Sequence, residues 1–358
     1  MSFGEIMRNN RGLGPGFDFL RLALALSVVL FHSFQLSYGY TWQSGPFAAV
    51  ISLIVPAFFA LSGFLVAGSM VRVKLVRTFL LFRLLRILPA LAVEITLSAL
   101  ILGPIVTSLP LREYFSDPQL SSYFANVVGF IHYRLPGVFL GNPVTGIVNG
   151  QLWTIPSELH CYVMLAVLML LRVATRPRVT LAIFLAGAGL ETVFAFLPGH
   201  VGDRRLFSSQ ELLILCFLCG NIFFLWRDHV PARWYLFVAS AAVYVLLYNF
   251  APVLSLLLGV VCATYFITFL GMQRMPRIPL LMGGDYSYGI YLYSFSLQQT
   301  VAWALPDHRE WWVNLALGGP AAILIAMFSW HVVEKPALGL RKLFAPKVLN
   351  PRPLTEPA

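Results

Sequence analysis

Long apolar runs separated by short basic segments limit what this 358-residue chain can fold into. Each run can form a helix of about 20 residues, the length that crosses a bilayer. The runs begin near residues 17, 46, 79, 147, 179, 211, 234, 252, 285 and 312. The chain is 58% hydrophobic and 11% charged, whereas soluble domains average about 25% charged residues. We therefore expect an all-α fold, a polytopic transmembrane helical bundle with about ten spans.

The basic residues predict how the chain is oriented in the membrane. When successive connecting segments are assigned to alternate sides, all but five of the 25 Lys and Arg residues fall on one side. The five are Arg112, Arg134, Arg204, Arg205 and Arg309. Cytoplasmic segments carry the excess of Lys and Arg, so both termini are expected in the cytoplasm. The net charge of +10 therefore reflects the orientation of the chain in the membrane. We expect the lipid bilayer as a partner, and we do not expect nucleic acid.

The same topology divides the chain into three parts. Residues 1–16 are expected to form a cytoplasmic N-terminal segment, 17–335 one transmembrane domain, and 336–358 a short basic cytoplasmic tail without order. The first apolar run is too long and too polar for a signal peptide, so it is expected to stay as the first span. The longest connecting segment, residues 107–149, is expected outside the cytoplasm. It either contacts a substrate or packs as a lid.

Arg21 and His32 lie in one apolar run, FDFLRLALALSVVLFHSF, eleven residues apart. Eleven residues make about three helical turns, so both side chains fall on one face, about 16 Å apart along the axis. Ionisable groups in a membrane helix are costly and indicate a functional site. This pair suits a cation that binds phosphate near the cytoplasm and a general base deeper in the membrane. The alternative is a snorkelling Arg and a hydrogen-bonded core His.

Two further motifs add charged groups. In FRLLRILPA, Arg83 and Arg86 share a helix face and suit a pyrophosphate or phosphoadenosine group, although membrane-anchoring arginines are also common. In GQLWTIPSELHCY, Glu158 and Tyr162 are one turn apart on a span entered from outside. Glu158 would reach the level of His32 and could orient its imidazole, as carboxylates do in hydrolytic triads. The alternative is a protonated Glu in a packed interface.

The run GDYSYGIYLYSFSLQQT carries tyrosines, serines and two glutamines. Sugar rings stack on aromatic side chains and sugar hydroxyls bond to amides, so Tyr288, Tyr291 and Ser294, together with Tyr162, are candidates for an acceptor pocket. An aromatic belt at the membrane interface is the alternative. The pair Cys216 and Cys219 lies inside an apolar run without further ligands. It is interpreted as core packing, and no metal is expected.

Taken together and in order, these pieces resemble the acyltransferase 3 family of bacterial membrane proteins that O-acylate glycans outside the cytoplasm. The matching segments also include VPAFFALSGFLVAGS and VEKPAL, and they extend from the first span to the last. One departure lies after Tyr293, where many members carry a His and, two residues later, a Pro. Ser294 and Ser296 stand there in this chain, so a second histidine and the family's acceptor pocket are in question.

The resemblance implies a ten-helix core, a cytoplasmic acyl-CoA donor, usually acetyl-CoA, and a carbohydrate hydroxyl as acceptor. It also implies that His32 is the essential catalytic residue and that the arginines serve the donor. Acyl-CoA would be a co-substrate, with no cofactor bound permanently. The expected location is the bacterial cytoplasmic membrane. His32 would either deprotonate the sugar hydroxyl or relay the acyl group through a covalent intermediate. Two other interpretations are open. The protein could be a transporter or flippase of a sugar or lipid-linked glycan, or it could be a membrane scaffold.

Overall fold

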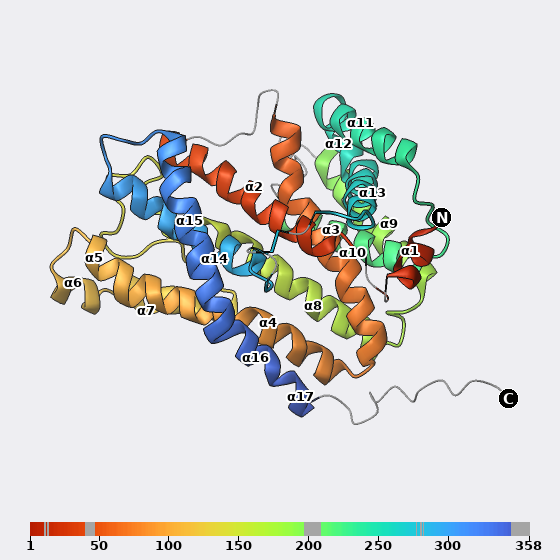
Figure 1. The fold of residues 1–358 in the computed structure, drawn as a ribbon, viewed down its shortest axis with the longest axis horizontal. Coiled ribbons are helices and arrows are strands. Elements are labelled where there is room, and N and C mark those ends of the chain that lie inside the picture. Colours follow the sequence, from red (N-terminus) through yellow and green to blue (C-terminus); the bar gives the residue numbers. More distant parts are fainter. Residues whose placement is uncertain are drawn as a thin grey trace.

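The computed structural model describes residues 1–10, 12, 14–39, 47–196, 209–276, 278–279, 281 and 283–344. Every regular element in these ranges is a helix (Figure 1). The long helices are α2 (Phe17–Tyr38), α3 (Ala48–Val73), α4 (Val76–Leu97), α8 (Ile155–Leu170), α9 (Pro177–Phe196), α10 (Gln210–Leu225), α11 (Trp234–Phe250), α13 (Val260–Gly271), α14 (Ser287–Ala304) and α15 (Trp311–Ser329). The shorter helices are α1 (Phe3–Asn9), α5 (Gly103–Val106), α6 (Leu111–Ser116), α7 (Pro118–Tyr123), α12 (Pro252–Leu254), α16 (Lys335–Gly339) and α17 (Arg341–Phe344).

Tighter or wider turns extend several of these helices. Turns of 3₁₀ helix occupy Phe124–Val128 and Gly150–Thr154, and π-helical turns occupy Ser98–Leu102, Ser255–Gly259 and Trp330–Glu334. π-Turns are rare and occur mostly as single turns inside α-helices. Two of them follow α4 and α15 directly, so each of these helices continues past its regular part.

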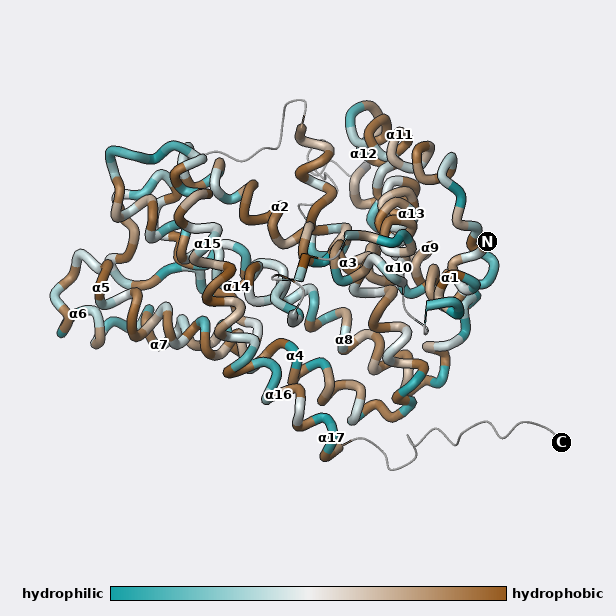
Figure 2. The backbone as a smooth tube through the Cα atoms, viewed as in Figure 1, coloured by the Kyte–Doolittle hydropathy of each residue, from teal (hydrophilic) through white to brown (hydrophobic). Residues whose placement is uncertain are grey.

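Seven helical stretches among the described residues are long and apolar enough to cross a membrane, and α10 and α11 are shorter apolar helices. Figure 2 shows the corresponding pattern, with hydrophobic long helices and hydrophilic connections. Large apolar side chains such as Phe250, Leu324 and Phe328 are exposed on the outside of the bundle, as expected where lipid takes the place of water. The protein is therefore a helical, multi-pass membrane protein. Each of the ten runs in the sequence forms a helix, although α14 is not among the seven because its Tyr, Ser and Gln residues lower its hydropathy.

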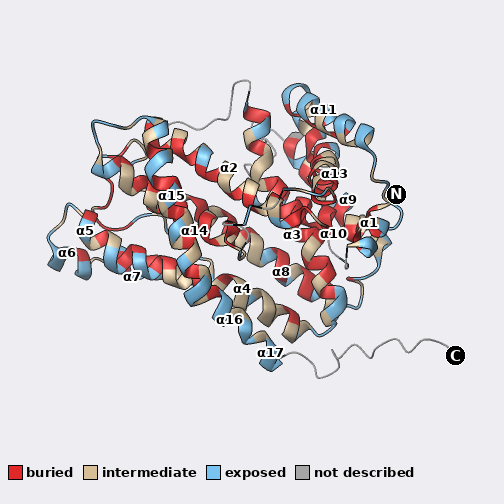
Figure 3. Cartoon of the chain, viewed as in Figure 1, coloured by how far each residue is buried: buried red, intermediate tan, exposed pale blue. Residues whose placement is uncertain are grey.

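Small residues let the central helices approach closely. A Cβ atom on Gly63 of α3 would lie 1.9 Å from the backbone oxygen of Phe217 on α10, and one on Gly220 would lie 2.0 Å from that of Ala60. Helices in membranes pack through such small residues because lipid supplies no hydrophobic drive between them. Figure 3 shows that the buried positions face this interior, and the exposed positions lie on the outer faces.

The segment 107–149 is a packed cover over one end of the bundle. Its side chains Tyr114, Tyr123 and Phe139 are fully buried. Gln299 of α14 holds it in place, because its amide nitrogen donates to the carbonyls of Val144 and Ile147 at 2.8 and 2.7 Å. This packing agrees with the lid interpretation, and contact of the segment with a substrate stays a prediction.

Both chain ends contain more structure than the sequence predicts. The N-terminal helix α1 buries Phe3, whose backbone N–H donates to the carbonyl of Val230. The region after Glu334 was expected to be disordered, but it is helical in α16 and α17. The physical reason is an anchor to α4, because Arg341 donates to the carbonyl of Phe82 at 2.7 Å and lies over its ring. The rest of the predicted tail, 345–358, lies outside the described residues.

Candidate functional site

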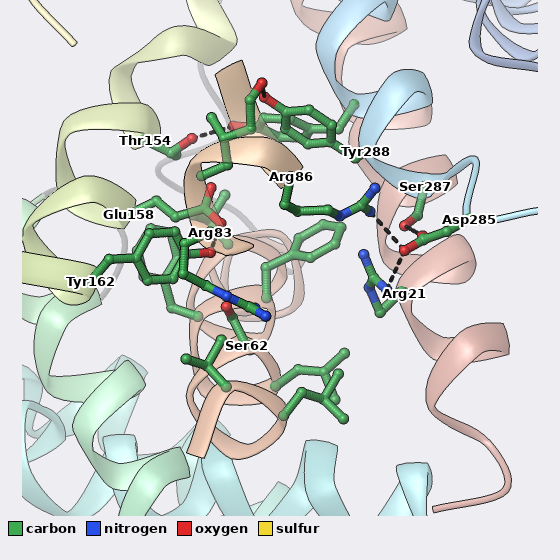
Figure 4. Close-up of a pocket in the computed structure, with 18 of the residues that line it drawn as sticks. Arg21, Ser62, Arg83, Arg86, Thr154, Glu158, Tyr162, Asp285, Ser287 and Tyr288 are labelled. Carbon is green, nitrogen blue, oxygen red and sulfur yellow. Dashed lines mark hydrogen bonds and ion pairs between the residues drawn. The ribbon is translucent and has the colours of Figure 1, made fainter. Parts of the chain in front are cut away.

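A cavity of about 310 Å³ opens between the helices that carry the predicted site residues (Figure 4). Helices α2, α3, α4, α8 and α14 form its walls, and α16 and α17 border it near the end of the described chain. The polar residues that line it are Arg21, Ser62, Arg83, Arg86, Thr154, Glu158, Tyr162, Asp285, Ser287, Tyr288, Tyr291 and Arg341. The structure therefore brings all three predicted donor-binding arginines to one place.

Asp285 joins two of these arginines. Its Oδ2 accepts hydrogen bonds from Arg21 and Arg86, each at 2.7 Å, and its Oδ1 accepts from the hydroxyl of Ser287 at 2.9 Å (Figure 4). Arg86 has a second carboxylate partner, because it also donates to Glu334 Oε2 at 3.0 Å. Its guanidinium lies over the ring of Tyr288. Such charge-assisted bonds hold a planar guanidinium in one orientation.

Arg83 has a different environment. It donates to the hydroxyl of Ser69 at 3.2 Å, and its Nε is buried without a partner. In Figure 4 it lies beside Glu158 and Tyr162. These two residues interact with each other, since the hydroxyl of Tyr162 donates to Glu158 at 2.5 Å across one helical turn. The predicted pairing of Glu158 and Tyr162 on one face is therefore present.

The predicted contact between Glu158 and His32 is absent. Glu158 lines the cavity and bonds to Tyr162, whereas His32 does not line the cavity. The reason lies in the outer cover. Val148 and Asn149 at the end of this cover, and Gln151 just after it, are already buried before α8 begins. The membrane-embedded part of this chain segment therefore starts well inside the fold, and Glu158 lies at the level of the arginines.

His32 lies one helical turn beyond the end of the cavity. Its ring packs edge-on against Phe295, with centroids 4.9 Å apart, and its Nδ1 is buried without a hydrogen-bond partner. Tyr291 precedes Phe295 by one turn on the same face of α14 and lines the cavity. The hydroxyl of Tyr291 contacts that of Thr154 at 2.7 Å and donates to the carbonyl of Gln151 at 2.8 Å. Tyr291 therefore connects the cavity lining with the residue that packs against His32.

Three of the four candidate acceptor residues, Tyr162, Tyr288 and Tyr291, line the cavity. All three hydroxyls already have protein partners; that of Tyr288 donates to the carbonyl of Ile87 at 3.1 Å. The fourth, Ser294, is fully buried outside the lining and donates to the carbonyl of Tyr291. The predicted acceptor tyrosines and the predicted donor-binding arginines therefore line the same cavity.

Sequence reasoning missed three charged residues of this site, Asp285, Glu334 and Arg341. Each occurs at an end of an apolar run that was expected on the cytoplasmic side, where Arg21, Arg83 and Arg86 were also placed. Acidic residues at the same level as several membrane arginines are the signal that could have identified them, because buried charges are normally paired. Their partners could not have been assigned without the fold.

Comparison with known proteins identifies similar sequences over most of the chain. A family model described as an acyltransferase domain matches residues 15–331. An O-acetyl transferase of Shigella phage Sf6 is 28% identical over 89% of this chain and 94% of its own length. Nodulation protein 10 of Rhizobium leguminosarum bv. viciae is 27% identical over 94% of this chain and 97% of its own length. No solved structure matches the chain significantly.

Proposed function

Since this chain belongs to the acyltransferase 3 family and is a membrane O-acyltransferase, we propose that it moves an acetyl group from acetyl-CoA to a carbohydrate hydroxyl. The donor arrives from the cytoplasm, and the acceptor is a glycan outside the cytoplasm or linked to lipid. The acetyl group is chosen because the phage relative is named an O-acetyl transferase. The enzyme works in the cytoplasmic membrane of a bacterium, with both termini in the cytoplasm.

The observation that carries the proposal is the arginine-lined cavity. Arg21, Arg83 and Arg86 come from two different helices and face one space of about 310 Å³. Guanidinium groups bind phosphate oxygens with two parallel hydrogen bonds, and they remain charged at any physiological pH. The phosphates of coenzyme A bind inside this arginine-lined cavity. The pantetheine arm then extends between α2, α3 and α14 toward Thr154 and Tyr291.

His32 serves as the general base of the transfer. Its imidazole takes the proton of the sugar hydroxyl while the hydroxyl oxygen attacks the thioester carbonyl. The C–O bond forms, the C–S bond breaks, and coenzyme A leaves as a thiolate that receives the proton. Because the hydroxyl of Tyr291 is bonded to Thr154 and to the carbonyl of Gln151, the side chain of Tyr291 must turn aside before the thioester reaches His32.

Glu158 acts on the donor side of this scheme. Its bond to Tyr162 and its position in the cavity beside Arg83 support a role in orienting a cation. We assign Glu158 a positioning role toward Arg83. Tyr288 and Tyr291 line the route between the arginines and His32. The acceptor approaches from the covered end of the bundle, near Phe295.

The decisive experiment replaces His32 by Ala in cells that depend on this gene for glycan acetylation. Mass spectrometry of the surface glycan should show the loss of one acetyl group per modified unit, because removing a general base lowers the rate by about 10²–10⁴-fold. His308→Ala is the control, since His308 is exposed. Equal amounts of folded protein are verified first. Acetylation that persists in His32→Ala contradicts the assignment.

A second measurement separates the enzyme from a transporter. Purified protein in detergent is titrated with coenzyme A by calorimetry. Saturable binding agrees with the proposal. Flux of a glycan through vesicles without any binding of coenzyme A would instead support a transporter or flippase.

A further inference from the structure

The arginines in the cavity differ in whether an acidic side chain already neutralises them. Arg21 and Arg86 share Asp285, and Arg86 also pairs with Glu334. Arg83 and Arg341 have no ion pair within 4.0 Å to any carboxylate that the structure describes. The Nε atoms of both are buried without a hydrogen-bond partner. Two of the four guanidiniums therefore have no direct carboxylate partner and one unused donor each.

Arg341 is held beside Arg83 by the backbone of α4. Its Nη2 donates to the carbonyl of Phe82, the residue before Arg83, at 2.7 Å. Its guanidinium lies 5.4 Å from the centroid of the Phe82 ring. Both arginines line the cavity, and the bond to Phe82 holds Arg341 next to the backbone of Arg83. A cluster of like charges in a partly buried place is destabilising unless an anion occupies it.

We propose that Arg83 and Arg341 form the phosphate-binding site of this cavity and that Arg21 and Arg86 serve mainly to fix its wall through Asp285 and Glu334. The ligand group is a phosphate monoester or pyrophosphate of a nucleotide. This inference rests on the proposed function, because it assigns the phosphates of acyl-CoA to two particular side chains. It adds Arg341, which no sequence motif indicated, to the donor site.

The assignment rests on which arginines have guanidinium N–H groups that are free to bind a phosphate. A phosphate that approaches Arg21 or Arg86 competes with Asp285 for the same guanidinium nitrogen atoms. At Arg83 and Arg341 no carboxylate among the described residues lies within ion-pair distance, so the phosphate displaces no ion pair there. Arg341 also lies on the last described helix, α17, at the end of the bundle that is expected to face the cytoplasm.

The test is calorimetric titration of the full-length protein in detergent with adenosine 3′,5′-bisphosphate, and with adenosine as the probe without phosphate. Arg341→Gln and Arg83→Gln should each weaken binding of the bisphosphate about tenfold, the effect of losing one charge-assisted contact. Arg341→Lys retains the charge and should stay within about threefold of the original protein. Adenosine should bind each variant alike.

Arg227→Gln is the matched control. Arg227 is built like Arg341, since it donates to the carbonyl of Phe224 at 2.8 Å and lies 4.4 Å from the centroid of that ring. It does not line the cavity, so its variant should bind the bisphosphate normally. Size-exclusion profiles verify that every variant is folded.

The outcomes distinguish this inference from the proposed function. If Arg341→Gln binds the bisphosphate as tightly as Arg227→Gln does, Arg341 is not part of the site and the inference is wrong, while glycan acetylation that depends on His32 would still stand. If the unmodified protein binds no bisphosphate, the inference fails together with the donor assignment. A selective tenfold loss in Arg341→Gln and Arg83→Gln supports the assignment.

Discussion

The ion pairs of Asp285 provide a prediction whose size follows from the structure. Replacing Asp285 by Asn removes the negative charge that Arg21 and Arg86 share, and leaves Arg86, whose side chain is 13% exposed, with Glu334 alone. Removing one partner of a fully buried ion pair costs about 3–5 kcal/mol. The side chain of Asp285 is 29% exposed, so solvent screening places the expected loss near the lower limit, at about 3 kcal/mol.

Asp228→Asn is the matched control. Asp228 pairs with Arg8 on the surface, where the side chains of Arg8 and Asp228 are 63% and 44% exposed. Exposed pairs contribute about 0–1 kcal/mol. The two variants make the same chemical change at an Asp that is paired with Arg. They differ in burial, in the number of arginines bound and in the hydrogen bond that Asp285 accepts from Ser287.

The assay is thermal unfolding in detergent, followed with a thiol-reactive dye. Cys161, Cys216 and Cys219 are buried and free, so unfolding exposes them to the dye. For a chain of this length, 3 kcal/mol corresponds to a lowering of Tm by about 4 °C. Asp228→Asn should lower Tm by about 1 °C or less. Equal Tm values for the two variants would show that the Asp285 cluster does not stabilise the bundle and would refute the reasoning.

Two further substitutions test the packing that positions the site. Gly63→Ala should greatly reduce the yield of folded protein, because its Cβ would lie 1.9 Å from a backbone oxygen of α10 and overpacking costs about 1–3 kcal/mol or more. Gly189→Ala, which meets nothing within 4 Å, should express normally; equal yields would contradict the close contact. Gln299→Leu should speed limited proteolysis within residues 107–149, because one buried and two partly buried hydrogen bonds are lost, at about 2–4 kcal/mol in total. An unchanged cleavage rate would argue against Gln299 as the anchor of the cover.

Local sequence patterns were enough to establish the class of fold and the helical positions of several site residues. Hydropathy over about 20 residues is a local property, so the apolar runs could be read directly as helices. Helical periodicity is local too, and it correctly placed Tyr162 one turn from Glu158 on one face. The same reasoning singled out Arg21 and Arg86, because an arginine inside an apolar run is costly wherever the run packs.

Which charges meet depends on the folded arrangement of the helices. Arg21 and Asp285 are 264 positions apart, and Arg86 and Glu334 are 248 apart. Neither pairing has a local signature. The depth of Glu158 was misjudged because counting residues from a run's end cannot show that a folded cover lies above it. Helices in a membrane can slide and rotate relative to one another without changing their hydropathy. Partner choice therefore depends on the packing of small residues and polar groups between helices, which a single sequence does not display.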